Sequence, residues 1–173
     1  MTRLNFEFKA ISDSISNLEA LLQPLHPQFI GVDQQKDTYF NVPNGRLKLR
    51  EGNIENALIH YQRTNVSGAK QSDVLLYQHQ PDPSLKQLLI AALGIKIVVD
   101  KKRRIYFVDN VKFHFDEVAD LGTFVEVEAI DKDGTIGIER LKEQCREYAH
   151  LFSIKEEDYV ALSYSDLMIQ KQA

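Results

Sequence analysis

Asn5-Phe6-Glu7-Phe8-Lys9 is the stretch on which the prediction of the fold depends. In an extended strand, successive side chains point to opposite faces, so Asn5, Glu7 and Lys9 share one face and the two phenylalanines share the other. Such alternation usually indicates a half-buried strand with its polar face in water. The alternative is that the charged face lines a ligand site, and the rest of the chain bears on that choice.

Later segments repeat the alternation, with an excess of cations on the charged face. In residues 46–50, two arginines and a lysine alternate with Leu47 and Leu49. Turn signals at Asn44-Gly45 and Gly52-Asn53 favour an antiparallel meander. The predicted strands cover residues 4–9, 29–32, 37–40, 46–50, 56–63, 74–79, 95–108, 111–116 and 123–130, with a loop at 65–71.

Helices are expected between and after the strands, because apolar residues there recur at helical spacing. Ser12 is the expected N-cap of the first helix, and Pro83 and Gly94 bound the second. The four predicted helices cover residues 11–25, 83–93, 138–151 and 156–169.

The pattern favours an α+β fold in a single domain of residues 1–173. We expect a closed antiparallel β-barrel of about eight strands with helices packed outside. In a plain barrel the interior is apolar. Here we favour the reverse, with the charged faces inward around a ligand tunnel, although periodicity alone does not decide which face points inward. Leu47, Leu49, Phe113, Phe115 and Val127 would then point outward, under the helices of residues 11–25 and 138–151.

Composition narrows the classes of function. The 173 residues are 43% hydrophobic and 27% charged, which suits a packed domain. A net charge of −4 argues against a general binder of nucleic acid or of anionic membranes. Cys145 is the single cysteine, and it excludes an intramolecular disulfide. With no apolar run near the length of a membrane span, we expect a cytoplasmic protein, and a homodimer is a possible assembly.

The charged faces bring together more cations than acids. Packing like charges together is costly unless a ligand neutralises them, and a polyphosphate would do so. Glu126 and Glu128 alternate on one strand, so both can reach one hard cation such as Mg²⁺. The sequence therefore predicts a metal–triphosphate site. Its candidate residues are the cations Lys9, Lys48, Arg50, Arg63, Lys101, Arg103 and Lys112 and the acids Glu7, Asp116, Glu126 and Glu128.

Three details stay open at this point. Lys101 and Arg103 are the inward pair of the longest strand, unless the register shifts by one residue and turns every side chain over. His114 fits a structural histidine better than a catalytic base. Tyr39 and Tyr61 suit either stacking on an aromatic ligand group or packing in the core.

These residues fall in blocks that resemble the CYTH superfamily, which is named for class IV adenylyl cyclase and thiamine triphosphatase. The blocks occur in the family's order and cover nearly the whole chain, and the cyclase-like bacterial branch is the most similar. They are Asn5-x-Glu7-x-Lys9, Asp37 to Phe40, Gly45 to Glu51, Tyr61-x-Arg63, Lys101-x-Arg103, Val111 to Val118, Leu121 to Glu128, and Ser163 to Leu167.

The resemblance implies a triphosphate tunnel in which the seven cations hold the phosphates. Glu7, Asp116, Glu126 and Glu128 would hold one or two Mg²⁺ or Mn²⁺ ions, and Lys9 would join Glu7, Glu126 and Glu128 in catalysis. The implied activity is class IV adenylyl cyclase-like, from ATP to cyclic AMP and pyrophosphate. The alternatives are a thiamine triphosphatase, an inorganic tripolyphosphatase, or a non-catalytic protein that binds a triphosphate or another polyanion.

Two positions depart from the family's pattern. Asn5 replaces the first acid of the opening motif, and an amide oxygen is a weaker metal ligand than a carboxylate. Lys112 stands where an arginine is expected, which keeps the charge but loses the bidentate fork.

Overall fold

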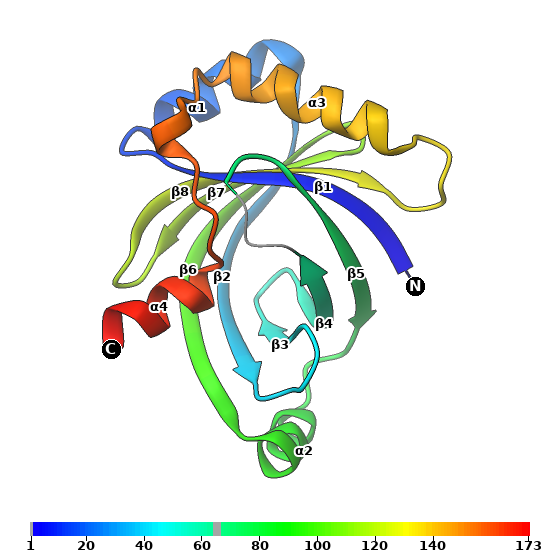
Figure 1. Ribbon diagram of the computed structural model, residues 1–173, viewed down its shortest axis with the longest axis vertical. Helices are drawn as coiled ribbons and strands as arrows, with labels where there is room; N and C mark the ends of the chain where they lie inside the picture. The colour runs from blue at the N-terminus through cyan, green and yellow to red at the C-terminus, as the bar shows by residue number, and fades with distance from the viewer. Residues whose placement is uncertain (1, 64–66) are drawn as a thin grey trace.

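Eight antiparallel strands close into a barrel, which confirms the predicted α+β fold (Figure 1). The computed structural model describes residues 2–63 and 67–173, except for the side chains of Thr2 and Arg63. The strands are β1 (Thr2–Ile11), β2 (Gln28–Phe40), β3 (Arg46–Glu51), β4 (Asn56–Arg63), β5 (Lys70–Gln78), β6 (Ile95–Val108), β7 (Val111–Val118) and β8 (Gly122–Asp131). Around the barrel they follow the order β1-β5-β4-β3-β2-β6-β7-β8, so β1 closes the ring by pairing with both β5 and β8.

The alternation in β1 decides which face of the barrel is charged. Glu7 pairs with Glu128, and Lys9 pairs with Glu126, across the β1–β8 ladder. Directly paired residues point to the same side of a sheet, so these charges gather on one face. Phe8, on the other face of β1, is buried in an apolar cluster outside the barrel.

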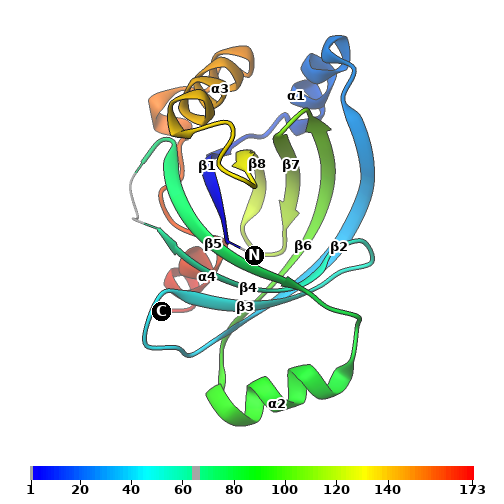
Figure 2. The same ribbon diagram turned by 90° about the vertical axis from the view of Figure 1, so that its right-hand side faces the viewer.

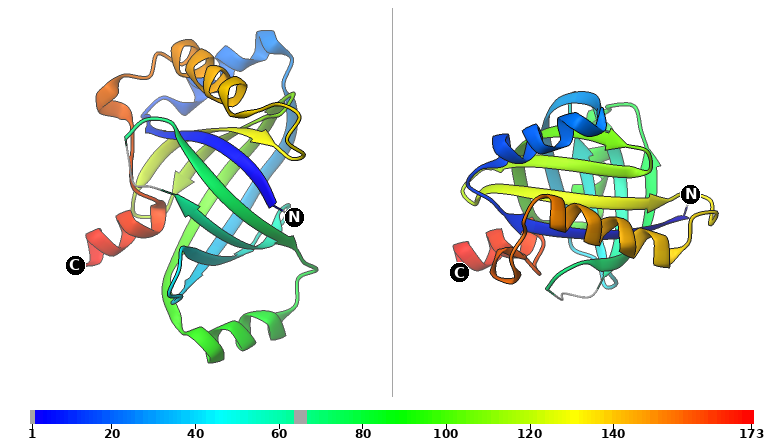
Figure 3. Two further views of the ribbon diagram at one scale, coloured as in Figure 1. Left: turned by 45° about the vertical axis from the view of Figure 1, so that its right-hand side comes forward. Right: turned by 90° about the horizontal axis from the view of Figure 1, so that it is seen from above.

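Two helices cover one side of the barrel, α1 (Ile15–Leu22) and α3 (Ile138–Leu151). The helix α3 lies across the outer faces of β1 and β8, and α1 lies across those of β7 and β8 (Figures 2 and 3). Leu22 and Leu141 join Phe113, Phe115 and Val127 in one buried cluster. These three strand residues therefore point outward under the helices, as predicted.

The helix α2 (Pro83–Leu93) covers a different side of the barrel. Leu89 packs with Phe40 and Leu49, and Leu47 contacts the same cluster. Leu47 and Leu49 do face outward, but the prediction that they lie under the other two helices is wrong. The reason is topological, because β3 is separated from β7 by β2 and β6 in the closed sheet.

The C-terminal part of the chain is not one helix of residues 156–169, as the sequence suggested. A short 3₁₀ turn, η2 (Glu156–Asp158), is followed by an extended segment and then by α4 (Tyr164–Gln172). The segment stays extended because Tyr159 forms a β-bridge with Ala10 and the Val160 amide donates to the Lys9 carbonyl. Tyr164 and Met168 then pack against Val99, Val118 and Phe124.

The first predicted helix, residues 11–25, also begins too early. Ile11 still pairs with Phe124, and the Ser12 amide donates to the Thr123 carbonyl, so strand pairing holds the chain extended. The helix begins at Ile15 and continues into a 3₁₀ turn, η1 (Gln23–Leu25). Ser12 is not the N-cap; its hydroxyl accepts a hydrogen bond from the Ser14 amide.

Two predicted strands, 29–32 and 37–40, are parts of the single strand β2. Residues 33–36 between them were not predicted as strand, but they pair with β6 throughout. The predicted loop at 65–71 is shorter on its C-terminal side, because β5 begins at Lys70; residues 64–66 lie outside the described part of the chain. In the part that is described, no helix is long and apolar enough to span a bilayer.

Replacing Phe113 tests which face of the sheet is the core. Its ring is fully buried and meets the rings of Tyr148 and Phe152 edge-on at centroid distances of 4.7 and 6.1 Å. Phe113→Ala should lower the free energy of unfolding by about 3–5 kcal/mol in a denaturant titration. Leu88→Ala is the control, because Leu88 is 63% exposed and should change it by no more than about 0.5 kcal/mol. Equal effects of the two changes would contradict the outward apolar face.

Candidate functional site

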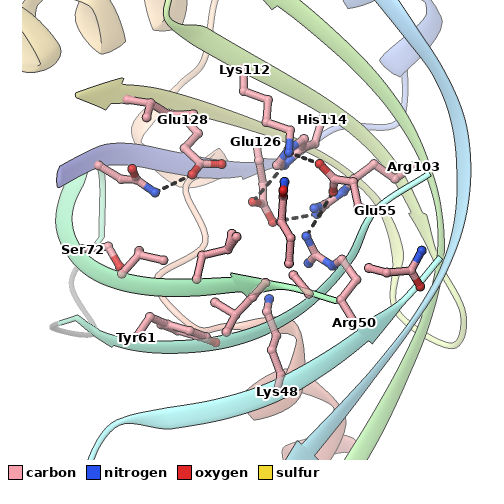
Figure 4. A pocket seen from close by; sticks show the side chains of 18 of the residues that line it. Lys48, Arg50, Glu55, Tyr61, Ser72, Arg103, Lys112, His114, Glu126 and Glu128 are labelled. Carbon is pink, nitrogen blue, oxygen red and sulfur yellow. Dashed lines mark hydrogen bonds and ion pairs between the residues drawn. The ribbon is translucent and has the colours of Figure 1, made fainter. Parts of the chain in front are cut away.

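The barrel encloses a cavity of about 850 Å³ whose described lining is rich in charge (Figure 4). Cations outnumber acids among these residues, although the chain as a whole is acidic. The charged faces thus point inward, as predicted. The cationic side chains are Arg3, Lys9, Lys48, Arg50, Lys101, Arg103, Lys112 and Lys132, and the acidic ones are Glu7, Glu55, Glu126 and Glu128.

Six of the seven predicted phosphate-binding cations line this cavity, and the side chain of the seventh, Arg63, lies outside the described residues. The predicted register of β6 is confirmed, because Lys101 and Arg103 face the cavity. Lys102 points outward beside Glu117, with 3.7 Å between their charged atoms. Arg104 also points outward, and it donates to Glu19 of α1.

Asp37 of β2 holds three of these cations in place. It is fully buried, and it accepts two hydrogen bonds of 2.9 Å from Arg50 and one of 2.7 Å from Lys101. Lys48 Nζ lies 3.4 Å from the same carboxylate. Burial alone would raise the pKa of Asp37, but the charges of Arg50 and then Lys101 lower it well below its usual value. The carboxylate therefore stays ionised.

The pKa of Lys101 is lowered even though its ammonium group donates to Asp37. Burial lowers the pKa of Lys101 to about 7, and the charges of Arg50 and Arg103 act in the same direction. Asp37 opposes this shift without cancelling it. Lys101 is therefore near its titration point at neutral pH, and an anion in the cavity would favour its protonated form.

Asp116 of β7 is placed behind the lining, not at the cavity surface. Arg103 donates to both of its oxygens, at 2.7 and 2.6 Å, and the Tyr164 hydroxyl donates at 2.7 Å. Both oxygens are thus engaged in holding Arg103, whose pKa is raised well above its usual value despite the opposing effect of burial. In this geometry the carboxylate of Asp116 orients Arg103, and metal binding by Asp116 stays a prediction.

Glu126 of β8 is surrounded by three nitrogen groups. Lys9 Nζ lies 3.8 Å away, Arg103 Nη2 3.5 Å away, and His114 Nδ1 3.4 Å away. Burial raises the pKa of Glu126, but Lys9 and Arg103 lower it well below its usual value. Burial, followed by Arg103, lowers the pKa of His114 to about 3, so its ring is neutral. Among the described residues, His114 Nε2 has no hydrogen-bond partner.

The other acids lie at the β1–β8 ladder, where Glu7 and Glu128 are paired. Burial and the nearby charge of Glu7 raise the pKa of Glu128. Asn5 Nδ2 donates to Glu128 at 2.5 Å, and Arg3 donates to it at 3.4 Å. Asn5 Oδ1 is buried, and within the described residues it has no hydrogen-bond partner.

The chemistry of Asn5, Glu7 and Glu128 suits a divalent cation. In the described part of the chain, no three His, Cys, Asp or Glu side chains are clustered closely enough to form a metal site. Asn5 Oδ1, Glu7 and Glu128 nevertheless offer hard oxygen donors on adjacent strands, which is the ligand type that Mg²⁺ and Mn²⁺ prefer. A cation there would give the amide oxygen a partner and offset the repulsion between the two carboxylates.

The cavity wall is not charged all the way round. Residues of β4 and β5 contribute apolar side chains to it, among them Ala57, Ile59, Val74 and Leu76. Tyr39 and Tyr61 also line it, and Lys48 Nζ lies 5.6 and 5.3 Å from their ring centroids, which is within reach of a cation–π interaction. The cavity therefore has a cationic side and an apolar side.

Two functional contacts escaped the sequence prediction. Glu55 projects into the cavity from the turn between β3 and β4, where alternation carries no signal. Tyr164 lies in a block that resembles the family, but its hydrogen bond to Asp116 joins residues 48 positions apart. Only the folded chain shows that partner.

Solved structures share this fold at low sequence identity. The PH1012 protein from Pyrococcus horikoshii OT3 has a TM-score of 0.77 at 23% identity, over 94% of this chain and 98% of that chain. A candidate adenylate cyclase from Vibrio parahaemolyticus has a TM-score of 0.79 at 16% identity, over 96% and 98%. HpAC1 from Hippeastrum, for which a dominant triphosphatase activity is described, has a TM-score of 0.61 at 15% identity, over 98% and 95%.

No curated protein matches the sequence. The family described as the CYTH domain matches residues 3–164, which is nearly the whole chain. The match covers all eight strands of the barrel, except for Thr2 at the start of β1. This chain therefore belongs to the CYTH domain family.

Proposed function

We propose that this protein is a Mg²⁺- or Mn²⁺-dependent enzyme that acts on a triphosphate inside its barrel. The proposed reaction is the class IV adenylyl cyclase-like conversion of ATP to cyclic AMP and pyrophosphate. The observation that carries the proposal is the excess of inward cations in a cavity of about 850 Å³. Membership of the CYTH domain family supports it.

The cations are arranged to hold an extended anion. Asp37 and Asp116 fix Arg50 and Arg103 through paired hydrogen bonds, so both guanidinium groups are oriented before a ligand arrives. Preorganised donors of this kind stabilise the charge that develops on phosphoryl oxygens in a transition state. Lys9, Lys48, Lys101 and Lys112 would add point charges along the same ligand.

The acids on the β1–β8 side would complete the site. Asn5, Glu7 and Glu128 would hold the metal ion, and Glu126 is the further acid we assign to a second ion. When bound, the metal supplies positive charge to the phosphate oxygens and helps to orient them. Glu126 also holds Lys9 and Arg103 toward the cavity through its ion pairs.

The apolar side of the cavity supports a triphosphate that carries an organic group. Ile59, Val74 and Leu76 would contact such a group while the cations bind the phosphates. This supports ATP or thiamine triphosphate over inorganic tripolyphosphate.

A triphosphatase is the second candidate, because the phosphate clamp would serve hydrolysis as well as cyclisation. The triphosphatase activity described for HpAC1, which shares the fold, favours testing it. A non-catalytic triphosphate-binding protein is the third, and the replacement of an acid by Asn5 is its main support.

Product analysis separates these candidates. The purified protein is incubated with ATP, thiamine triphosphate or tripolyphosphate in Mg²⁺ or Mn²⁺, and the products are identified by chromatography and mass. Cyclic AMP with pyrophosphate supports the cyclase, and orthophosphate with a diphosphate supports a triphosphatase. Tight binding without turnover would support the non-catalytic triphosphate-binding protein. The absence of both binding and turnover would overturn the proposal.

Glu128→Gln tests the metal assignment. The change keeps the size of the side chain but removes a charge from the Asn5, Glu7 and Glu128 group, so metal-dependent turnover should fall by about 100-fold or more. Mn²⁺ titration of the variant should show a matching loss of metal affinity. Glu117→Gln is the control, because it removes the same charge from an exposed position beside Lys102. Unchanged metal dependence in Glu128→Gln would sink the assignment.

The pKa of Lys101 predicts how binding depends on pH. Because that pKa is lowered to about 7, Lys101 carries its charge below neutral pH and loses it above. Affinity for tripolyphosphate should therefore fall as the pH rises from about 6.5 to about 8.5, with proton uptake on binding in calorimetry. Lys101→Arg should abolish the decline, because a guanidinium stays protonated throughout this range. An affinity that rises with pH in the unaltered protein would contradict the prediction.

A further inference from the structure

Glu55 forms a bridge across the interior of the barrel (Figure 4). One of its carboxylate oxygens accepts from Lys112 of β7, and the other lies 3.3 Å from Arg50 Nη1 of β3. These strands are not neighbours, because β2 and β6 separate them in the closed sheet. The side chain therefore crosses the space that a ligand of the cationic side would occupy.

The backbone at Glu55 is fixed by the fully buried Asp33 of β2. Asp33 accepts from the amides of Ile54 and Glu55, both at 2.9 Å. Gln35 Nε2 donates both to Asp33, at 2.8 Å, and to the Glu55 carboxylate, at 3.0 Å. The turn also packs closely, since a Cβ at Gly52 would lie 2.5 Å from Asp33 Oδ1. Any movement of the Glu55 carboxylate must therefore come from its own side-chain rotation.

Glu55 differs from the acids that hold the other cations. Asp37 and Asp116 are fully buried behind Arg50 and Arg103, so a ligand can contact these cations without removing the acids. The side chain of Glu55 is 26% exposed and lines the cavity. Burial raises its pKa, but Lys112 and Arg50 lower it well below the usual value, so it stays an anion.

We propose that Glu55 is an internal competitor of the phosphate ligand. Its carboxylate occupies Lys112 and Arg50 in the unliganded protein, and a triphosphate gains full contact with this pair only by displacing it. A phosphate group carries more negative charge and more acceptor oxygens than one carboxylate, so the exchange favours the ligand. The inference rests on the proposed triphosphate binding, and it makes Glu55 a residue that limits affinity without being catalytic.

Glu55→Gln tests the proposal, because glutamine keeps the size and the acceptor oxygen but removes the competing charge. Tripolyphosphate should bind about tenfold more tightly to this variant, as measured by titration calorimetry at fixed pH and ionic strength. The midpoint of thermal unfolding without ligand should fall, because Lys112 and Arg50 lose a counter-ion. If the role of Glu55 were purely structural, Glu55→Gln would lower both the stability and the affinity. A lower stability together with a higher affinity therefore distinguishes the competitor role.

Glu51→Gln is the matched control, from the same turn region. Glu51 pairs with Lys86 of α2 away from the cavity, and its replacement changes the net charge by the same amount. It should leave the affinity for tripolyphosphate unchanged. If the unaltered protein binds and Glu55→Gln binds equally or more weakly, the competitor role is overturned while the proposed function stands. If the unaltered protein and both variants fail to bind, triphosphate binding itself is refuted, and the competitor role with it.

Discussion

Crowding of like charges inside the barrel is the constraint on which the rest of the structure depends. Cations on β1, β3, β6 and β7 face one cavity, and their mutual repulsion has to be offset before any ligand binds. Buried Asp37 and Asp116 provide this compensation from behind the cavity wall, through paired hydrogen bonds to Arg50 and Arg103. The compensation is incomplete, because cations still outnumber acids around the cavity when Asp37 and Asp116 are included. That residual positive charge is what an anionic ligand would meet.

The charged cavity holds only part of the apolar core, since Ile59 and Val74 line its wall, and two further apolar clusters lie outside the barrel. The outer faces of β1, β7 and β8 pack under α1 and α3, and the outer faces of β2 and β3 pack under α2 (Figure 1). Because the helices bury these outer apolar faces, much of the hydrophobic stabilisation lies outside the cavity. The cavity can remain open to a ligand while rings such as those of Phe113 and Phe115 hold the sheet in shape.

Local alternation predicted the charged faces of β1, β3, β7 and β8. Together with the spacing to Asn110, it favoured Lys101 and Arg103 over their neighbours in β6. It could not assign partners that depend on the closed topology. The placement of Leu49 under α2 follows from the position of β3 in the ring, and Asp116 is drawn away from the cavity surface by Arg103 and Tyr164. Glu55 lies in a turn, where periodicity says nothing about the direction of a side chain. The end of β1 at Ile11 was missed because strand pairing overrides helical spacing there.

The most direct measurement of the central claim is a crystal structure of the protein grown with tripolyphosphate and Mn²⁺. The account predicts phosphate density inside the barrel, within hydrogen-bonding distance of Arg50, Arg103 and Lys112. It also predicts anomalous signal from manganese beside Asn5, Glu7 and Glu128. Phosphate bound only on the outer surface, with water alone among the inward cations, would contradict the claim that this cavity is a triphosphate site.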